Sequence, residues 1–408
     1  MQDLLLSYRI LNDIYTNRAY ASIELGKSLE EAKSKDFVTK LVYGVLEKDV
    51  QLNYYINLLT VKKPKNSIIL VLKIGMYCIK YMNSMPDYAT VSNCVLLAEK
   101  INKKELKGFV NAVLKKYILV KDNLPEKYEE RLSVETSTPL WLVNLYLKEY
   151  GDETEKFLKC NHTTLEHVRI NRRLYSIQEL EKTLVDSGLE YKKSIEDALY
   201  VQNSNVIRKL FDKGLVTIQS LTSMECAKSL DVKDGHKVLD VCAAPGGKSE
   251  YLSELAKIDL ISCDIHDHRL NLIKSYFSRM HTQGCNVVKN NGTILREEYI
   301  NKFDRVLCDV PCSGLGIIHK KPDILLNLER KDIDSLVDVQ KGIINTSAKY
   351  VKKHGKLVYS TCTILKEENE EIVNEFLKEN KEYKMLYQKQ FLPSEEHDGF
   401  YIAVLEKL

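Results

Sequence analysis

The sequence predicts a multidomain chain with an all-α N-terminal domain, a small α+β linker domain and a C-terminal α/β domain. Three observations favour this fold class. The 408 residues exceed what a single core usually holds. Apolar residues recur at helical spacing through about the first 117 positions, and from Val238 onward short apolar runs alternate with helical segments. We place the three domains at residues 1–130, 131–215 and 216–408.

The N-terminal domain is expected to be a helical bundle. Residues 37–46 and 69–77 place apolar side chains at the spacing of one helix face, and Gly and Pro are sparse throughout the region. The domain has its own apolar periodicity and carries none of the chemical motifs described below. We therefore expect it to separate cleanly from the rest of the chain.

A charged stretch over residues 121–139 leads into the linker domain; it contains two prolines and predicts a linker or helical bridge. Beyond it, residues 167–171 and 190–193 are expected to form strands around a helix over residues 177–187. This segment is therefore predicted to be a small α+β unit.

The C-terminal domain is expected to contain a parallel, doubly wound sheet, because its short apolar runs are separated by helical segments. Ligands of such sheets bind outside the carboxyl ends of the strands. The predicted strands lie at residues 238–242, 260–264, 287–289, 305–309 and 356–360.

Composition and charge exclude several classes of protein. A formal charge of +3 is too small for a polycation held to nucleic acid by bulk charge, so any RNA contact must come from local Lys and Arg patches. The sequence has no apolar signal-peptide core and no run long enough to span a membrane, so we expect a cytoplasmic protein without a membrane partner. Its 10 cysteines are scattered without a CxxC pair, which favours neither a metal site nor a disulfide framework.

A small-residue turn follows the strand that ends near Asp240. A phosphate-binding P-loop would need Gly where Cys242 stands, and a dinucleotide fingerprint would need GxGxxG, which is absent. An S-adenosylmethionine site fits better, with the turn receiving the amino-acid portion and Asp264, at the end of the next strand, accepting the ribose hydroxyls. From the turn alone, an ordinary glycine-rich first turn of an α/β domain explains the pattern equally well. The turn consists of Cys242, Ala243, Ala244, Pro245, Gly246, Gly247 and Lys248.

Two cysteines follow later strands of the predicted sheet. Cys312 comes after the strand that ends in Asp309, and Cys362 comes after the strand over residues 356–360. Either thiol alone is more simply explained as packing. Together at matching strand ends, they favour covalent catalysis on an electron-poor ring such as cytosine, whose carbon 5 becomes nucleophilic when a thiolate adds at carbon 6. The residues by themselves do not decide which thiol attacks.

At these motifs the sequence resembles the Sun/RsmB branch of the RNA 5-methylcytosine methyltransferases. The resemblance covers nearly the whole chain and rests on residues 239–248, 309–316 and 360–362, and on residues 214–224 with Gln219. The N-terminal region is similar to the NusB-like RNA-binding domain of that branch through residues 36–46, 85–87 and 108–114.

The resemblance implies a Rossmann-like class I methyltransferase domain that uses S-adenosylmethionine to methylate carbon 5 of a cytosine in 16S ribosomal RNA. It assigns Cys362 as the nucleophile and Cys312 as the thiol that assists release of the product. It places Asp309 against both cofactor and base, the latter near N3.

The same resemblance implies a cofactor pocket formed by the turn from Cys242 to Lys248, with Asp264, Asn291 and Asp309. Asn291 stands where the family usually has Asp, and Ser220 after Gln219 stands where relatives often have Asp.

Partners and rival functions follow from the same reasoning. We expect a monomer that acts on 16S ribosomal RNA, free or early in small-subunit assembly, and needs no metal. The alternatives are a 5-methylcytosine methyltransferase for transfer RNA or another RNA, and a non-catalytic NusB-like RNA-binding factor, which would be expected to have lost the motif residues. Lys320 and Lys321 are expected beside the substrate entrance. The other candidate phosphate contacts are Lys103, Lys104, Lys107, Lys115, Lys116, Arg172, Arg173, Lys192 and Lys193.

Overall fold

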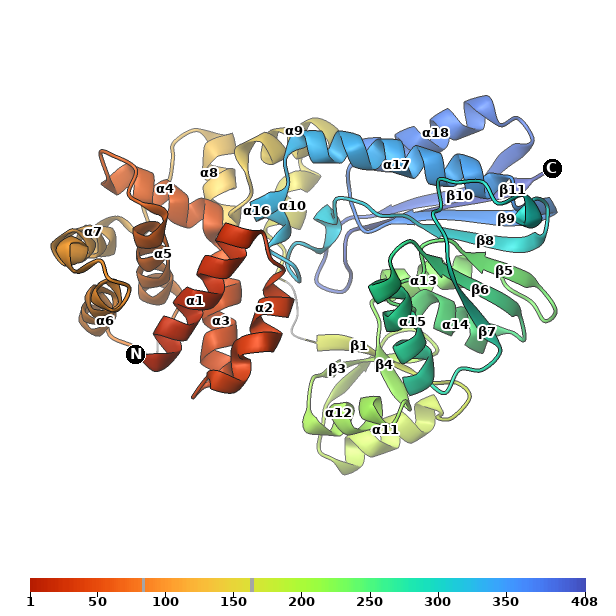
Figure 1. Ribbon diagram of the computed structural model, residues 1–408, viewed down its shortest axis with the longest axis horizontal. Helices are drawn as coiled ribbons and strands as arrows, with labels where there is room; N and C mark the ends of the chain where they lie inside the picture. The colour runs from red at the N-terminus through yellow and green to blue at the C-terminus, as the bar shows by residue number, and fades with distance from the viewer. Residues whose placement is uncertain (83–84, 162–164) are drawn as a thin grey trace. The chain divides into compact units, whose positions relative to one another are not determined.

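The computed structural model describes residues 1–82, 85–161 and 165–408 (Figure 1). The chain divides into two compact units. The first comprises Met1–Lys159 with Ile318–Leu328, and the second comprises Cys160–Ile317 with Glu329–Leu408. Each unit is described separately below.

The first unit is helical, as the apolar spacing predicts. Helix α5 is its central element, because nearly every side chain between Ile68 and Ile79 is buried. The other helices between Gln2 and Val120 pack their apolar faces against α5 in one core. The helices are α1 (Gln2–Asn17), α2 (Ala21–Ser28), α3 (Lys35–Glu47), α4 (Asp49–Leu59), α5 (Asn66–Tyr81), α6 (Asp87–Lys100), α7 (Lys107–Val120), α8 (Tyr128–Thr136), α9 (Leu140–Tyr150) and α10 (Glu153–Leu158).

A distant segment of the chain completes this helical unit. Ile318–Leu328, which follows the Cys312 motif in sequence, contains the short helix α16 (Ile324–Asn327). Leu326 packs against the helical core. The pKa of Tyr43 on α3 is raised, first by burial and then by the nearby carboxylate of Asp323. The helical domain therefore does not separate from the chain at a single point, contrary to the expectation from the sequence.

The second unit begins with a four-stranded antiparallel sheet in the order β2-β3-β1-β4. The two predicted strands and the helix between them are confirmed as β1, β2 and α11, and α11 starts at a capping box between Ser176 and Glu179. Two further strands and a second helix in this segment were not predicted. The elements are β1 (Leu165–Ile170), α11 (Ile177–Asp186), β2 (Tyr191–Lys193), β3 (Ala198–Gln202), α12 (Asn205–Asp212) and β4 (Val216–Ile218).

The rest of the second unit is built on a seven-stranded sheet in the order β10-β11-β9-β8-β5-β6-β7. The five predicted strands are confirmed and run parallel to one another. The sheet is mixed rather than wholly parallel, because β11 inserts antiparallel between β9 and β10. The strands are β5 (Lys237–Asp240), β6 (Asp259–Asp264), β7 (Cys285–Lys289), β8 (Phe303–Asp309), β9 (Val351–Thr361), β10 (Tyr383–Phe391) and β11 (Phe400–Lys407).

Helices cover both faces of this sheet, as the doubly wound pattern predicts (Figure 1). Asp240, Asp264 and Asp309 each end a parallel strand, so they lie at one edge of the sheet, with Cys362 directly after β9. No helix in the described part of the chain is long and apolar enough to cross a membrane. The covering helices are α13 (Leu221–Ser229), α14 (Gly247–Leu255) and α15 (Asp267–Arg279) on one face, with α17 (Arg330–Ala348) and α18 (Glu370–Glu379) on the other.

Candidate active site

The predicted cofactor turn joins β5 to α14 at the carboxyl edge of the sheet. Gly246 has φ +116°, a conformation that a residue with a side chain rarely adopts, and it leads directly into the first turn of α14. The N–H of Ala243 donates to the carbonyl of Cys263 on β6 over 2.7 Å. The turn is therefore fixed against the neighbouring strand while the N–H groups at the start of α14 are available to a ligand.

Buried polar atoms without partners lie around this turn. Asp240 is fully buried, and one carboxylate oxygen accepts from the Ser249 hydroxyl over 2.7 Å. Within the described residues, its other oxygen has no hydrogen-bond partner, nor does the side-chain nitrogen of Asn290. Burial raises the pKa of Asp240 to about 7. Unsatisfied buried groups of this kind fit a site that completes its hydrogen bonds with a polar ligand.

Asp264 occupies the position that the sequence predicted for ribose binding. Its side chain is almost fully buried at the end of β6, 3.4 Å from Nε of Arg269. Asn290, just before the predicted adenine contact Asn291, donates its backbone N–H to the Asp264 carbonyl over 3.0 Å. Asn291 itself accepts from the N–H and hydroxyl of Thr293 over 3.0 and 2.8 Å. Its amide oxygen is thus engaged in a local turn.

Asp309 is held by two side chains from different elements. Lys248, the last residue of the cofactor turn, places Nζ 2.6 Å from one carboxylate oxygen, and the Ser360 hydroxyl donates to the other over 2.8 Å. Burial alone would lower the pKa of Lys248, but the adjacent Asp309 outweighs burial and raises it. The lysine is therefore charged when it pairs with Asp309.

The two predicted catalytic cysteines meet at the ends of adjacent strands. Their sulfur atoms are 3.3 Å apart, both side chains are half-buried, and neither cysteine forms a disulfide. The pKa of Cys312 is raised well above its usual value, first by the hydrogen bond with Cys362 and then by burial. The Cys312 thiol therefore resists ionisation, and although either sulfur can be the donor in this contact, its S–H can donate toward Cys362.

A close backbone contact fixes the loop that carries Cys312. The N–H of Gly316 donates to the Cys362 carbonyl over 2.9 Å, and its own carbonyl accepts from Gly399 over 2.9 Å. A Cβ on Gly316 would lie 2.1 Å from the Gly399 carbonyl oxygen, so no side chain fits there. The glycine therefore allows the two cysteine loops to approach each other.

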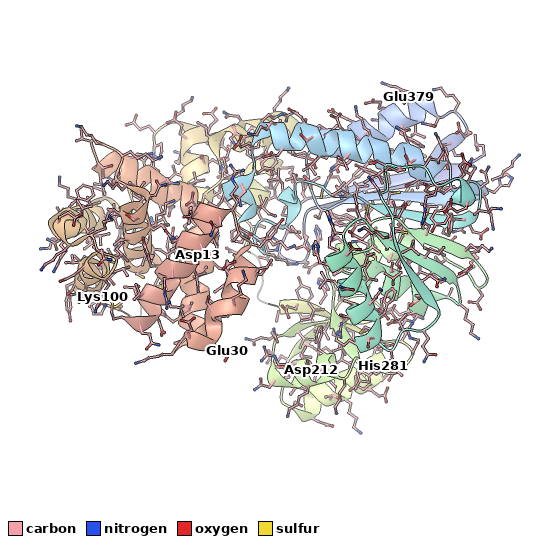
Figure 2. The ribbon with its side chains drawn as sticks, viewed as in Figure 1. Asp13, Glu30, Lys100, Asp212, His281 and Glu379 are labelled. Carbon is pink, nitrogen blue, oxygen red and sulfur yellow. The ribbon has the colours of Figure 1, made fainter. Side chains whose placement is uncertain are left out.

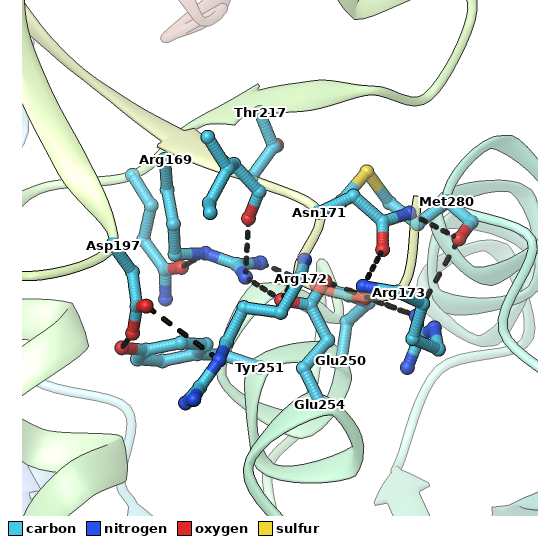
Figure 3. A network of polar contacts seen from close by, with 12 residues as sticks. Arg169, Asn171, Arg172, Arg173, Asp197, Thr217, Glu250, Tyr251, Glu254 and Met280 are labelled. Carbon is cyan, nitrogen blue, oxygen red and sulfur yellow. Dashed lines mark hydrogen bonds and ion pairs between the residues drawn. The ribbon is translucent and has the colours of Figure 1, made fainter. Parts of the chain in front are cut away.

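A buried ionic network holds α14 from the other side (Figure 3). Arg169 on β1 is fully buried. It forms ion pairs with Glu250 and, over 2.6 Å, with Glu254. Arg173 forms a second ion pair with Glu250, also over 2.6 Å. Burial raises the pKa of Glu250, but Arg169 and Arg173 outweigh it and lower the pKa overall. Burial and the neighbouring Glu250 raise that of Glu254 to about 9. Glu254 therefore takes up a proton more readily than Glu250.

Gln219 belongs to the same network. Its side-chain oxygen accepts from Nε of Arg169 over 2.8 Å, and its amide nitrogen donates to Ser223 over 3.1 Å. The motif around Gln219 thus supports α14, the helix that begins with the cofactor turn. Sequence reasoning missed Arg169 and its glutamates. A lone Arg on a short strand and two Glu on a helix resemble exposed charges.

Several of the predicted basic patches gather on the helical unit. A groove of about 910 Å³ between α6 and α7 is lined by Lys107 and Lys115, with Asp87, Asn111 and the largely exposed ring of Tyr88. Lys100, which ends α6, is labelled in Figure 2. The pKa of Glu99 is lowered, mainly by its hydrogen bond from Lys107 and to a smaller extent by the charges of Lys104 and Lys100.

The remaining basic residues lie elsewhere. Arg172 and Arg173 face Asp197 and Glu250. Lys193 reaches Glu181 over 3.5 Å. Lys320 and Lys321 lie in the segment that joins the helical unit, and their expected place beside a substrate entrance stays a prediction.

The mixed sheet, the acids at its strand ends and the glycine turn before α14 define a Rossmann-like methyltransferase domain, here with two thiols at the strand edge. The sequence matches the 16S rRNA methyltransferase RsmB/F family over residues 227–406, the NusB family over residues 2–118 and the RsmF/B-like ferredoxin-like domain over residues 138–208. The chain belongs to the RsmB/F methyltransferase family, whose cofactor is S-adenosylmethionine.

Similar proteins extend over most of the chain. A probable ribosomal RNA small subunit methyltransferase B of Bacillus subtilis is 33% identical over 391 residues, covering 91% of this chain and 86% of the relative. The ribosomal RNA small subunit methyltransferase B of Photorhabdus laumondii is 32% identical, covering 92% and 91%.

Among solved structures, the crystal structure of PH0851 has a TM-score of 0.84 at 22% identity, covering 100% of this chain and 99% of its own, and it supports the fold. A methyltransferase homolog protein from Pyrococcus horikoshii has a TM-score of 0.59 at 25% identity, covering 68% and 98%.

Proposed function

We propose that this methyltransferase modifies carbon 5 of a cytosine in 16S ribosomal RNA through a covalent adduct with Cys362. The observation that carries the proposal is the 3.3 Å contact between the Cys312 and Cys362 sulfur atoms, at the same edge of the sheet as the Asp309–Lys248 pair. A single buried thiol would be adequate as packing. Two half-buried thiols in hydrogen-bond contact form a pair in which one can carry negative charge while the other donates.

The reaction is written from the side chains that the chain supplies. Cys362 reacts as a thiolate, stabilised by the Cys312 S–H, and forms a bond from its sulfur to carbon 6 of cytosine. The electron pair of the 5,6 double bond moves to carbon 5, which then takes a methyl group. S-adenosylmethionine supplies that group as an electrophilic sulfonium methyl when it is bound. Loss of the proton from carbon 5 to a base restores the double bond and expels Cys362 as a thiolate.

Cys312 acts in the release step. The departing sulfur of Cys362 regains negative charge, and the S–H of Cys312 is positioned to donate to it. The raised pKa of Cys312, caused by its hydrogen bond to Cys362 and by burial, supports this role as a donor. This division of labour gives each thiol a different step.

The cofactor pocket is proposed to use Cys242, Ala243, Ala244, Pro245, Gly246, Gly247, Lys248, Asp264, Asn291 and Asp309. Asp264 would accept the ribose hydroxyls. Asn291 would have to give up its contact with Thr293 to bind adenine through its amide oxygen. Asp309, held by Lys248 and Ser360, is proposed to contact the base near N3.

The RNA contacts are proposed for the helical unit. Lys107 and Lys115 in the groove between α6 and α7 can meet phosphates, and the exposed Tyr88 offers a ring on which an unpaired base can stack. All proposed catalytic residues lie in one compact unit of one chain, which supports action as a monomer. We propose that the substrate is 16S ribosomal RNA, free or early in assembly, in the cytoplasm.

The test uses purified protein, radiolabelled S-adenosylmethionine and 16S ribosomal RNA. Cys362→Ala should abolish both methyl transfer and adduct formation. Cys312→Ala should transfer methyl but release slowly, leaving a protein–RNA complex that survives denaturing electrophoresis. An adduct seen with Cys362→Ala and never with Cys312→Ala would make Cys312 the attacking thiol. Bisulfite sequencing of RNA from cells with and without the gene for this protein would show whether the missing 5-methylcytosine lies in 16S ribosomal RNA or in transfer RNA.

A further inference from the structure

The turn that carries Cys312 depends on a buried carboxylate from another part of the chain. Glu368 ends the short 3-10 helix η5 (Lys366–Glu368), and its side chain is fully buried. One of its oxygens accepts the backbone N–H of Ser313 over 2.8 Å, and the other accepts the Ser313 hydroxyl over 2.5 Å. The residue directly after Cys312 is therefore held by two hydrogen bonds to one carboxylate.

The residue directly before Cys312 is held by the same group through one intermediary. The amide nitrogen of Gln340 on α17 donates to the Pro311 carbonyl and to Glu368, each over 2.9 Å. The hydroxyl of Tyr359 donates to the backbone carbonyl of Glu368 over 2.6 Å and fixes the position of η5. The Pro311–Ser313 turn has no regular secondary structure, so these side chains determine where the Cys312 thiol lies.

Glu368 has no cationic partner among the described residues, since its contacts are the neutral groups of Ser313 and Gln340. A buried carboxylate paired only with neutral donors is expensive for the fold. The adjacent Glu367, by contrast, forms an ordinary ion pair with Arg330 and is partly exposed. A carboxylate buried beside a reactive thiol without a cationic partner points to a functional constraint.

We propose that Glu368 is a positioning residue for Cys312, holding the Pro311–Ser313 turn so that the Cys312 thiol faces Cys362 as a hydrogen-bond donor. The inference rests on the proposed function, because it assigns Cys312 the release step. The titratable groups around Cys312 are Cys362, Glu368 and Tyr359. The raised pKa of Cys312 comes first from the Cys362 hydrogen bond and burial, with Glu368 adding in the same direction. Glu368 thus favours the protonated thiol.

The primary test measures alkylation of Cys312 by iodoacetamide as a function of pH, with peptide mass spectrometry to separate it from Cys362. Glu368→Gln keeps the size of the side chain and removes its charge. The pH midpoint for Cys312 alkylation should fall by about one unit, because the nearby negative charge no longer disfavours the thiolate. The matched control is Glu367→Gln, which removes a neighbouring surface charge and should leave the midpoint unchanged.

The second readout is the covalent protein–RNA complex. Glu368→Gln should prolong the life of this complex while the affinity for S-adenosylmethionine, measured by calorimetry, stays within about twofold of the original. If Glu368→Gln folds poorly, Ser313→Ala carries the test. It removes one donor and retains the charge, so it should prolong the complex without moving the alkylation midpoint.

An unchanged alkylation midpoint in folded Glu368→Gln, together with unchanged release, would overturn the proposal. Because alkylation needs no RNA, a shifted midpoint in a protein that forms no RNA adduct would support the positioning role and count against the covalent mechanism. Failure of the positioning role of Glu368 and failure of the covalent mechanism therefore give different results.

Discussion

Replacing Arg169 with Met should destabilise the second unit by several kcal/mol, because its guanidinium is fully buried between acidic side chains (Figure 3). Removing one partner of a buried ion pair costs about 3–5 kcal/mol, since the other charge stays buried without compensation. Arg173 remains beside Glu250, so the lower end of that range is expected. For a unit of roughly 150–250 residues, each kcal/mol lowers the melting temperature by about 2–4 °C. The expected decrease is therefore about 10 °C.

The assay must identify which transition belongs to the second unit. Thermal unfolding is followed by circular dichroism with and without S-adenosylmethionine, because a ligand raises only the transition of the unit that binds it. Arg172→Met is the matched control. Arg172 is about a third exposed and lies 3.5 Å from Asp197, so its loss should lower that transition by at most ~4 °C. Equal shifts for the two variants would refute the idea that the buried network holds α14.

Two further predictions concern the cofactor site. Asp264→Ala should weaken S-adenosylmethionine binding about tenfold or more by calorimetry, because the variant loses the acceptor proposed for the ribose hydroxyls; unchanged affinity in a folded variant would remove Asp264 from the site. Asp240 has a folded-state pKa of about 7, raised by burial from 3.8, so its contribution to stability is present below pH 4 and is lost as pH rises to 7. This loss amounts to about 4 kcal/mol at most. In urea unfolding, the free energy of unfolding should therefore fall less steeply between pH 4 and 8 in Asp240→Asn than in the original protein. An equally steep fall in the variant would contradict the raised pKa of Asp240.

The sequence predicted those elements whose pattern is local. Parallel strands such as β5 and β8 are short apolar runs ending in an acid, and that pattern placed Asp240, Asp309 and both thiols at one edge of the sheet. Strand β10 was missed because five of its nine side chains are exposed and four are Lys or Gln, as expected at a sheet edge. Strand β11 reverses the direction of the sheet, and no local pattern reports strand direction.

Other features depend on contacts between distant residues, which spacing does not reveal. The segment Ile318–Leu328 looks like a continuation of the catalytic loop, yet Leu326 packs on the helical core. Glu368 lies within the acidic run over residues 367–371, which resembles a solvated helix start. Only the three-dimensional structure shows that one acid of this run is fully buried beneath the Cys312 turn.

The buried acids of this domain differ in whether a cationic side chain pairs with them, and the difference follows their proposed roles. Glu250 is paired with two arginines, as a structural carboxylate should be. Asp240 has an oxygen without a partner and a pKa of about 7, raised by burial, while Glu368 has only neutral donors. A fold selected for stability alone would pair or replace both groups. Both acids lie at the proposed site: Asp240 ends β5 just before the cofactor turn, and Glu368 lies beneath the turn that carries Cys312, so the cost of burying them falls where the proposed chemistry takes place.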